Sequence, residues 1–430
     1  MSESPRTPSA PSPSLPLFLI TVSGQDAPGI TSELTGTLAK ANAKIRDIGQ
    51  AVIHGLLSLS ILFEIPESPP SLENAANHPV LKDLLFRAVQ LGLKLEYKVL
   101  PSSPKNTQTS AFATNPHRYV VTLLADQISA NALHEVTAVL AQARFNIDLI
   151  QRLSEDEFSC VELMVSTAIP TEVLEVKKKL LEIARDHAVD IALQKEGLFR
   201  RSKRLVVFDL DSTLIQCEVI DEFARELGVY GEVAEITERA MNGKIDFDES
   251  LRLRVSKLKG LTHAQIENVY QRIQLTPGAE DLVRTLSQLG YRTAIISGGF
   301  LTIAEKLRDR LGIHSVYANK LEFDAHGAAT GHVLPPIVNA QKKAALLEEL
   351  ARSEKVDLEQ VIAIGDGAND LLMLERAGLG IAFNAKPMVR EKAGTAINRK
   401  NLEAILHLLG ISRRDLTQQR EKPPQGDASH

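Results

Sequence analysis

The chain has 430 residues, which is too long for one ordinary domain. Hydrophobic residues make up 44% of it and charged residues 24%, as in a globular protein. A net charge of −5 argues against a dedicated nucleic-acid surface, because such surfaces concentrate lysine and arginine. No apolar run approaches the roughly 20 residues that a membrane-spanning helix needs. We therefore expect several globular domains, with neither nucleic acid nor membrane as a partner.

The N-terminal segment, residues 1–16, is rich in proline and serine and is predicted to be disordered. It lacks the basic and apolar regions of an export signal. The two cysteines, Cys160 and Cys217, do not have a metal-ligand spacing, and two thiols cannot form a disulfide framework. These features favour a cytoplasmic protein.

Two stretches of the chain repeat one order of predicted elements. Apolar periodicity predicts strand, helix, strand, strand, helix and strand over residues 17–99, and the same order returns over residues 118–197. Residues 100–117 between them are rich in proline, serine, threonine and asparagine and are interpreted as a linker. A βαββαβ unit of this size predicts a ferredoxin-like α+β domain, in which two helices cover one face of an antiparallel sheet.

From residue 203 to residue 412 the pattern changes to strands alternating with helices. Apolar strands are expected in LVVFDL, YRTAIIS, QVIAIGDG and LGIAF, each followed by a helical segment. This order predicts an α/β domain with a doubly wound parallel sheet. Apolar residues at helical spacing within residues 216–276 predict a helical cap inserted into that domain. Residues 413–430 are polar and are expected to form a flexible tail.

Acidic residues follow two of these predicted strands. Asp209 and Asp211 end the first, at the edge of an α/β sheet where ligands bind, and strand alternation points both to one pocket if the chain stays extended. Asp366, Asn369 and Asp370 follow a second strand. Crowded oxygen ligands of this kind suit Mg²⁺. Two acids near a turn can also be a solvated helix cap, so the first motif alone leaves both readings open.

Two further groups could hold a phosphate. Ser297, Gly298 and Gly299 end another predicted strand, and their backbone N–H groups can approach an anion closely, although a simple glycine turn has the same pattern. Lys343 stands at the start of a predicted helix, where the helix dipole favours an acid. We interpret it as an anion-binding residue. The neighbouring Lys342 is the competing candidate, and either could be an exposed helix lysine.

Taken together, DLDST, SGG, the lysine and GDGAND closely resemble the haloacid dehalogenase (HAD) superfamily of phosphatases. The segments FDLDSTLIQCEVIDE, SLRLRVSKLKGL and AIGDGANDLLML are similar to its phosphoserine phosphatase branch. The resemblance spans residues 203–412. It implies a HAD-type fold and Mg²⁺-dependent hydrolysis of O-phospho-L-serine to L-serine and phosphate, the last step of L-serine biosynthesis, through an aspartyl-phosphate.

The resemblance also implies a role for each candidate residue. Asp209 would be the nucleophile and Asp211 the proton donor and acceptor. Mg²⁺ would be held by the side chains of Asp209 and Asp366 and the carbonyl of Asp211, with Asp370 acting through a metal-bound water or Lys343. The substrate phosphate would be bound by the following residues: Ser297, Gly298, Gly299, Lys343 and Asn369.

The cap would recognise the amino-acid part of the substrate. By the resemblance, Glu218 faces the ammonium group and Arg254 forms a forked pair with the carboxylate. An ordinary surface ion pair is the alternative for these two residues. Met241 and Phe247 match apolar cap positions that close the site, and core packing is the alternative for both.

The first repeat resembles the ACT domain, a regulatory module that often binds amino acids, in the turn formed by residues 26–30 (DAPGI). Gly29 allows close backbone approach at a helix start, where free N–H groups can hold a carboxylate. The resemblance implies a serine effector at this domain and a homodimer formed through exposed sheet edges. The second repeat departs from this pattern, because its loop over residues 125–129 lacks the Pro-Gly pair, and this argues against ligand binding there. Packing and dimerisation alone are the alternative role for both modules.

Two other functions are compatible with parts of the sequence. One is a HAD phosphatase or phosphotransferase that acts on another small phosphate monoester. The charge pair expected from Glu218 and Arg254 argues against substrates without an amino-acid group. The other is an amino-acid-sensing binding protein with an inactive phosphatase domain. The presence of every required catalytic position argues against it.

Overall fold

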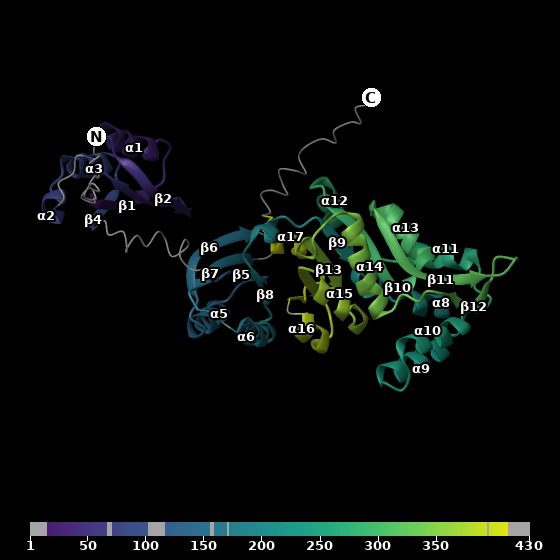
Figure 1. The fold of residues 1–430 in the computed structure, drawn as a ribbon. Coiled ribbons are helices and arrows are strands. Elements are labelled where there is room, and N and C mark those ends of the chain that lie inside the picture. The colour runs from purple at the N-terminus through teal and green to yellow at the C-terminus, as the bar shows by residue number, and fades with distance from the viewer. Residues whose placement is uncertain are drawn as a thin grey trace, which may run out of the picture. The chain divides into compact units, whose positions relative to one another are not determined.

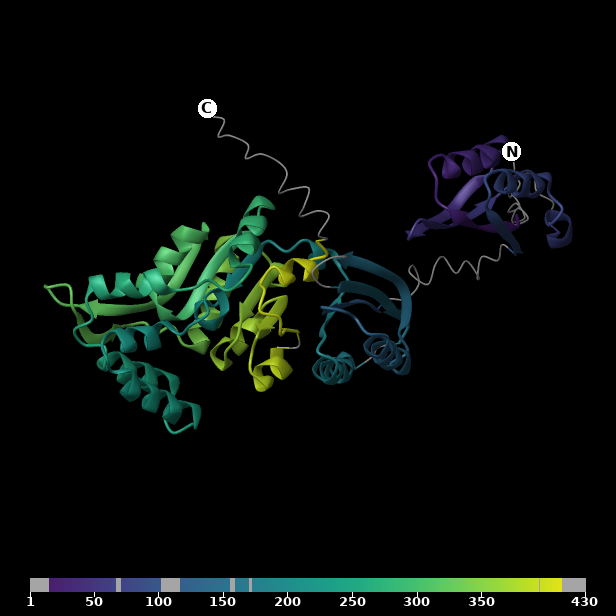
Figure 2. The same cartoon turned by 180° about the vertical axis from the view of Figure 1, so that it is seen from behind.

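The computed structural model describes residues 15–66, 71–101, 117–154, 159–169, 172–393 and 395–411. Residues 1–14, most of the predicted linker and the predicted tail lie outside this part of the chain, so the expectations about them stay predictions. The chain separates into two compact units, residues 1–110 and 111–430 (Figures 1 and 2). Within the described ranges, no helix combines the length and the apolar character that crossing a membrane requires.

The first unit contains one βαββαβ domain. Its elements are β1 (Leu17–Gln25), α1 (Ile30–Lys40), β2 (Lys44–Ile53), β3 (Leu56–Glu64), α2 (Leu72–Ala75), α3 (Pro79–Gln90) and β4 (Lys94–Leu100). The strands form an antiparallel sheet in the order β2-β3-β1-β4. Alternate residues of β1, namely Phe18, Ile20 and Val22, are buried in one core with α1 and α3. The predicted ferredoxin-like fold is confirmed here.

The second unit begins with the second βαββαβ domain. Its elements are β5 (His117–Ala125), α5 (Ala130–Gln142), β6 (Asn146–Ser154), β7 (Ser159–Thr167), α6 (Val173–Asp186) and β8 (Asp190–Lys195), with the sheet order β6-β7-β5-β8. Both faces of this sheet are covered. Leu123 packs with α5 and α6, whereas Leu124 on the opposite face belongs to the core of the following α/β domain. The second repeat is therefore packed against that domain through its sheet.

The α/β domain is built on a doubly wound sheet, as predicted. Its strands are β9 (Leu205–Phe208), β10 (Arg292–Phe300), β11 (Ser315–Phe323), β12 (Ala329–Leu334), β13 (Val361–Gly365), β14 (Leu379–Phe383) and β15 (Ala396–Ile397). The order is β12-β11-β10-β9-β13-β14-β15. Neighbouring strands run parallel except β12, which forms an antiparallel edge that the sequence pattern did not predict. The central position of β9 places the residue that follows it in the middle of the sheet edge.

Helices cover both faces of this sheet (Figure 1). Val206 and Phe208 of β9 pack with α12 (Ala279–Gln288) and α13 (Leu301–Leu311). Leu205 and Val207 point to the other face, toward α14 (Ala340–Ser353) and α15 (Leu371–Arg376). This side-chain alternation explains why β9 is apolar throughout, since it is buried on both faces.

A helical cap is inserted between β9 and α12. It consists of α8 (Val219–Glu226), α9 (Tyr230–Met241), α10 (Phe247–Ser256) and α11 (His263–Arg272). Phe223 of α8 stacks on Phe300 at the end of β10, with ring centroids 5.6 Å apart. The base of the cap is thus held against the strand that carries the Ser-Gly-Gly sequence.

Candidate active site

Asp209 directly follows β9 and is anchored by the backbone around it. Its N–H donates to the carbonyl of Ile364 at 2.8 Å, and its Oδ1 accepts from the N–H of Leu210 at 2.7 Å. The side chain is almost completely buried. Because the neighbouring strand β13 supplies one of these partners, the position of Asp209 is fixed by the centre of the sheet.

We expected the chain to stay extended after Asp209. Instead it turns there. Residues 210–214 form an irregular turn in which Asp211 is extended (φ −63°, ψ 133°) and Ser212 has φ 56°, a left-handed conformation that is uncommon outside glycine. The turn still directs Asp211 into the pocket that Asp209 lines, where Asp211 Oδ1 accepts from the N–H of Val219 at the start of α8 (3.1 Å). Both acids reach one pocket because of this turn, and the hydrogen bond ties Asp211 to the cap.

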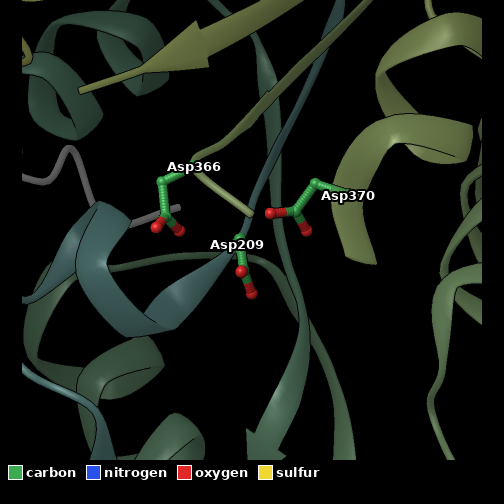
Figure 3. Close-up of side chains that lie close together, drawn as sticks. All are labelled: Asp209, Asp366 and Asp370. Atoms are coloured by element: carbon green, nitrogen blue, oxygen red, sulfur yellow. The ribbon is translucent and has the colours of Figure 1, made fainter. Parts of the chain in front are cut away.

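The GDGAND sequence brings two more acids to the same edge. Asp366 follows β13, and Asp370 turns back so that its Oδ2 accepts from the N–H of Gly367 at 2.9 Å. A side chain at Gly365 would place its Cβ 2.5 Å from Asp370 Cγ, so glycine is required there. Asp209, Asp366 and Asp370 each present a carboxylate oxygen, and these oxygens lie within 4.8 Å of one another (Figure 3).

One lysine is buried inside this acidic cluster. Lys343 Nζ lies 2.9 Å from Asp209 Oδ1 and 2.7 Å from Asp370 Oδ1, and the side chain has no exposed surface. Burial opposes its charge, but the two carboxylates outweigh that effect and raise the pKa of Lys343. Lys342 instead lies near Glu349 at the helix surface, 3.7 Å away. Of the two lysines weighed from the sequence, the structure therefore brings Lys343 to the acids.

The remaining negative charge is only partly offset. Burial, reinforced by Asp209 and Asp370, raises the pKa of Asp366 to about 8. Burial and Asp209 likewise raise the pKa of Asp370 to about 7. Burial, with Glu218 and Asp209 nearby, also holds the pKa of Asp211 well above its usual range. The three clustered carboxylates of Asp209, Asp366 and Asp370 are accompanied by one buried ammonium group, that of Lys343. This excess of negative charge is typical of a site that can hold a cation.

The Ser-Gly-Gly sequence forms the opposite wall. A Cβ added to Gly299 would lie 2.5 Å from Asp211 Oδ2, and one added to Gly298 would lie 3.2 Å from Phe247 Cζ. Ser297 Oγ accepts from the N–H of Gly299 at 2.9 Å. The two glycines are therefore explained by close approach of the backbone to Asp211 and to the cap.

Two asparagines that sequence reasoning missed support this wall. The fully buried Asn319 donates to the carbonyl of Gly298 and accepts from the N–H of Val338, both at 2.8 Å. Asn339 caps the helix of Lys343 and donates to Asp248 of the cap at 3.0 Å. Only the N-cap role of Asn339 had a sequence signal, since asparagine before a predicted helix favours capping.

The cap residues expected from the sequence also face the pocket. Glu218 begins α8 and accepts from Ser212 Oγ at 2.9 Å, while Arg254 is half-buried on α10. No salt bridge joins Glu218 to Arg254 within the described ranges. Met241 is 68% exposed and Phe247 is half-buried, so neither is a buried core residue of the cap.

A pocket of about 530 Å³ collects most of the predicted residues. Those that line it are Asp209, Asp211, Glu218, Met241, Phe247, Arg254, Ser297, Gly298, Gly299, Asp366 and Asn369. Lys343 and Asp370 do not line it. They are fully buried and reach the pocket through Asp209. Lys386, Met388 and Val389 of the α16 region (α16, Pro387–Ala393) also line it and had not been predicted.

Comparison with known proteins assigns families to all three domains. Residues 203–378 match the haloacid dehalogenase-like hydrolase family, and residues 16–98 and 117–194 each match an ACT domain family. A phosphoserine phosphatase of Streptomyces coelicolor is 41% identical over 94% of this chain and 94% of its own length. One of Mycobacterium tuberculosis is 39% identical over 93% of this chain and 94% of its own length.

Among solved structures, a HAD family hydrolase from Salmonella enterica matches with a TM-score of 0.59 and 32% identity, covering 67% of this chain and 98% of the other. The match agrees with the doubly wound sheet and the cap described above. The nearly full-length similarity to the two curated relatives includes both N-terminal repeats. The chain belongs to the phosphoserine phosphatase family of haloacid dehalogenase-like hydrolases, with two ACT domains in front of the hydrolase domain.

Proposed function

We propose that the protein hydrolyses O-phospho-L-serine to L-serine and phosphate, the last step of L-serine biosynthesis. The observation that carries this proposal is that one pocket collects both kinds of residue the reaction needs. Its base is the acidic cluster around Asp209, and its cap side offers Glu218 and Arg254, whose opposite charges suit the ammonium and carboxylate groups of an amino acid. Relatives that match over nearly the full chain are named phosphoserine phosphatases, which supports the same substrate.

The acidic cluster fits Mg²⁺. Three carboxylate oxygens lie within 4.8 Å of one another, and one buried ammonium cannot offset all three charges. In our proposal the side chains of Asp209 and Asp366 and the carbonyl of Asp211 would hold the ion, and Asp370 would support the site through Lys343, to which it is bonded. When bound, Mg²⁺ neutralises charge that would otherwise repel an anionic nucleophile from a phosphate.

The reaction then uses two acids in succession. A carboxylate oxygen of Asp209 attacks phosphorus in line with the seryl oxygen, which leaves as the aspartyl-phosphate forms. Asp211 donates the proton that the departing serine needs and afterwards takes one from the water that hydrolyses the intermediate. The raised pKa of Asp211 supports this role, because burial and the neighbouring acids favour the protonated form of this carboxyl group.

In our proposal the phosphoryl oxygens are held by groups that line the pocket beside Asp209. These groups are Ser297, the Gly298 and Gly299 backbone, and Asn369, whose Nδ2 would lie 3.7 Å from a Cβ added to Gly298. Lys343 supplies a fixed positive charge next to the nucleophile. Such preorganised donors stabilise the charge that spreads over the phosphoryl group in the transition state.

Phosphate release from O-phospho-L-serine tests the proposal. We expect release in Mg²⁺, none in EDTA, and much slower release from a simple phosphate ester. Equal rates on both substrates would support the alternative of a HAD phosphatase for another small ester. Absence of release from every substrate would contradict the enzyme assignment.

Arg254→Met tests the substrate class. We expect kcat/KM for phosphoserine to fall roughly 10- to 100-fold, as for loss of a hydrogen bond to a charged group, while kcat/KM for the simple ester changes little. Arg252→Met is the matched control, because Arg252 is an exposed arginine on the same helix. An equal loss on both substrates would mean that Arg254 stabilises the cap rather than the substrate carboxylate.

Metal removal is expected to make stability depend on pH. In EDTA, Asp366 and Asp370 have folded-state pKa values of about 8 and 7. Their values in the unfolded chain are near 4, so the folded state binds more protons between those limits. Stability therefore falls as pH rises from about 4 to 8, and Mg²⁺ should remove much of this fall.

Melting temperatures at several pH values, with EDTA and with Mg²⁺, check this. The difference in melting temperature between the Mg²⁺ and the EDTA samples should increase as pH rises. The Asp366→Asn substitution should make this difference smaller. A constant gap would show that the cluster does not bind the ion in its ionised form.

The first ACT domain enters the proposal as a serine-binding module and a dimer contact. Gly29 has φ 96° at the start of α1, and an added Cβ would meet no atom within 4 Å, so open space lies over the helix start. The edge strand β2 exposes Ile45, Ile48 and Ile53, which supports pairing with a second chain. Serine titration by calorimetry, with Gly29→Val as the comparison, tests the effector. Light scattering tests the homodimer.

A further inference from the structure

A second cleft lies between the second ACT domain and the hydrolase domain. Its volume is about 740 Å³. Residues from α6, β8 and α7 (Leu198–Arg201) line one side, and residues from α15, β14 and α16 line the other. The two sheets meet beside it, where Ala192 of β8 forms an antiparallel bridge with Thr395. The cleft belongs to neither domain alone and has no part in the chemistry proposed above.

The buried charges of this cleft are positive. Arg200 is 5% exposed, Lys203 is 7% exposed and Lys177 is half-buried. The glutamates that line it are exposed or half-buried, namely Glu196, Glu359, Glu375 and Glu391. An occupant that enters the cleft would therefore meet cations in the interior and acids only toward solvent.

These cations lack sufficient negative partners. The guanidinium of Arg200 pairs with the buried Glu162, but its Nε has no hydrogen-bond partner in the part of the chain that the structure describes. Lys203 donates to the backbone carbonyl of Glu359 and, within the same ranges, pairs with no carboxylate. Burial lowers the pKa of Lys203 to about 8 and also lowers that of Lys177. A buried cation without a counterion is unfavourable, and an anion would relieve that cost.

We propose that this cleft binds a small organic anion through a carboxylate or phosphate group held by Lys203, Arg200 and Lys177. The cleft also has apolar walls: Leu174 and Leu198, which are 65% and 82% exposed, line it. The ligand class is therefore a small metabolite with one anionic group and an apolar portion.

The cleft is connected to the active site by short rigid elements. The helix α15 begins immediately after Asp370 and carries Leu374 and Glu375 into the cleft lining. Its six residues span only about 9 Å. Similarly, the start of α16 lines the active-site pocket and its end, with Glu391 and Lys392, lines the cleft. Lys203 lies just before β9, which leads to Asp209. Occupancy of the cleft therefore changes turnover at the active site.

The test uses the full-length protein with Mg²⁺ and two probes, inorganic phosphate and malonate, titrated separately by calorimetry. We expect a binding event outside the active site for at least one probe. Lys177→Met combined with Lys203→Met should weaken it roughly tenfold or more, because charge-assisted hydrogen bonds are lost. Lys179→Met on the exposed side of α6 is the control and should bind as the wild type does. Lys177→Met alone serves if the double variant fails to fold.

Kinetics with phosphoserine give the second readout. The probe that binds should change kcat of the wild type and of the Lys179→Met protein but not of the double variant, whose activity without probe should stay within about twofold of wild type. The binding test does not depend on the proposed phosphatase activity. A negative result for anion binding would therefore not contradict the proposed activity, and the absence of activity would not contradict anion binding. Purely competitive inhibition by both probes, with identical binding to wild type and double variant, would overturn the proposal.

Discussion

Asp209→Asn is expected to reduce the rate of phosphoserine hydrolysis roughly ten-thousand-fold or more, as for removal of a nucleophile in covalent catalysis. The amide has nearly the same shape as the carboxylate but cannot attack phosphorus effectively. It also removes one of the two negative partners of Lys343, so the local charge changes as well. We expect no phosphorylated enzyme when the variant is mixed with substrate, whereas wild-type protein quenched in acid should carry phosphate on Asp209.

Asp309→Asn on the exposed surface of α13 provides the matched control and should keep full activity. Circular dichroism and melting curves establish whether the Asp209 variant is folded. A folded Asp209→Asn protein that retained a tenth of the wild-type rate would exclude Asp209 as the nucleophile. Phosphate trapped on another residue would assign the role of nucleophile to that residue and leave the reaction class unchanged.

The two ACT domains could be predicted well because their side-chain patterns are local. Apolar alternation and helical periodicity predicted the order strand, helix, strand, strand, helix and strand over residues 17–99, and β1, α1, β2, β3, α3 and β4 follow that order. Three strands of the α/β sheet were not predicted. β11 (SVYANKLEF) and β12 (ATGHVL) contain no apolar run longer than three residues, and β15 is only two residues long. The docking of the second ACT domain had no clear sequence signal. YVVTLLA in β5 and LFLITVS in β1 are both largely apolar, although most of β5 is buried on both faces and β1 on one.

The acids of the active site could be predicted from motifs at strand ends, since parallel strands deliver such residues to one edge. The contacts made by residues outside these motifs could not be predicted. The partnership of Asn319 with Gly298 joins residues 21 positions apart through a side chain that looks unremarkable in its strand. The cation-lined cleft likewise depends on how the second ACT domain packs against the hydrolase domain, and no local pattern encodes that packing.

Lys343→Met is expected to destabilise the metal-free protein by about 3–5 kcal/mol, the usual effect of removing one partner from a buried ion pair. Methionine fills much of the space, but Asp209 and Asp370 lose the only ammonium group bonded to them in the described part of the chain. The carboxylate of Asp370, whose pKa is already raised by burial and by Asp209, would then take up a proton more readily. The loss of stability should therefore be larger at pH 8 than at pH 5, where protonation neutralises the cluster.

Melting curves in EDTA at the two pH values, with Lys342→Met as the neighbouring control, measure this effect. Lys342 is partly exposed and its nearest carboxylate is 3.7 Å away, so its replacement should cost less than about 1 kcal/mol at either pH. Phosphoserine hydrolysis by the Lys343 variant should be lost even in Mg²⁺ at temperatures where it is folded, because the fixed charge beside the nucleophile is gone. If the variant is inactive but as stable as the wild type at both pH values, Lys343 contributes to catalysis and not to stability. An active variant would mean that the metal by itself supplies the positive charge that Asp209 needs.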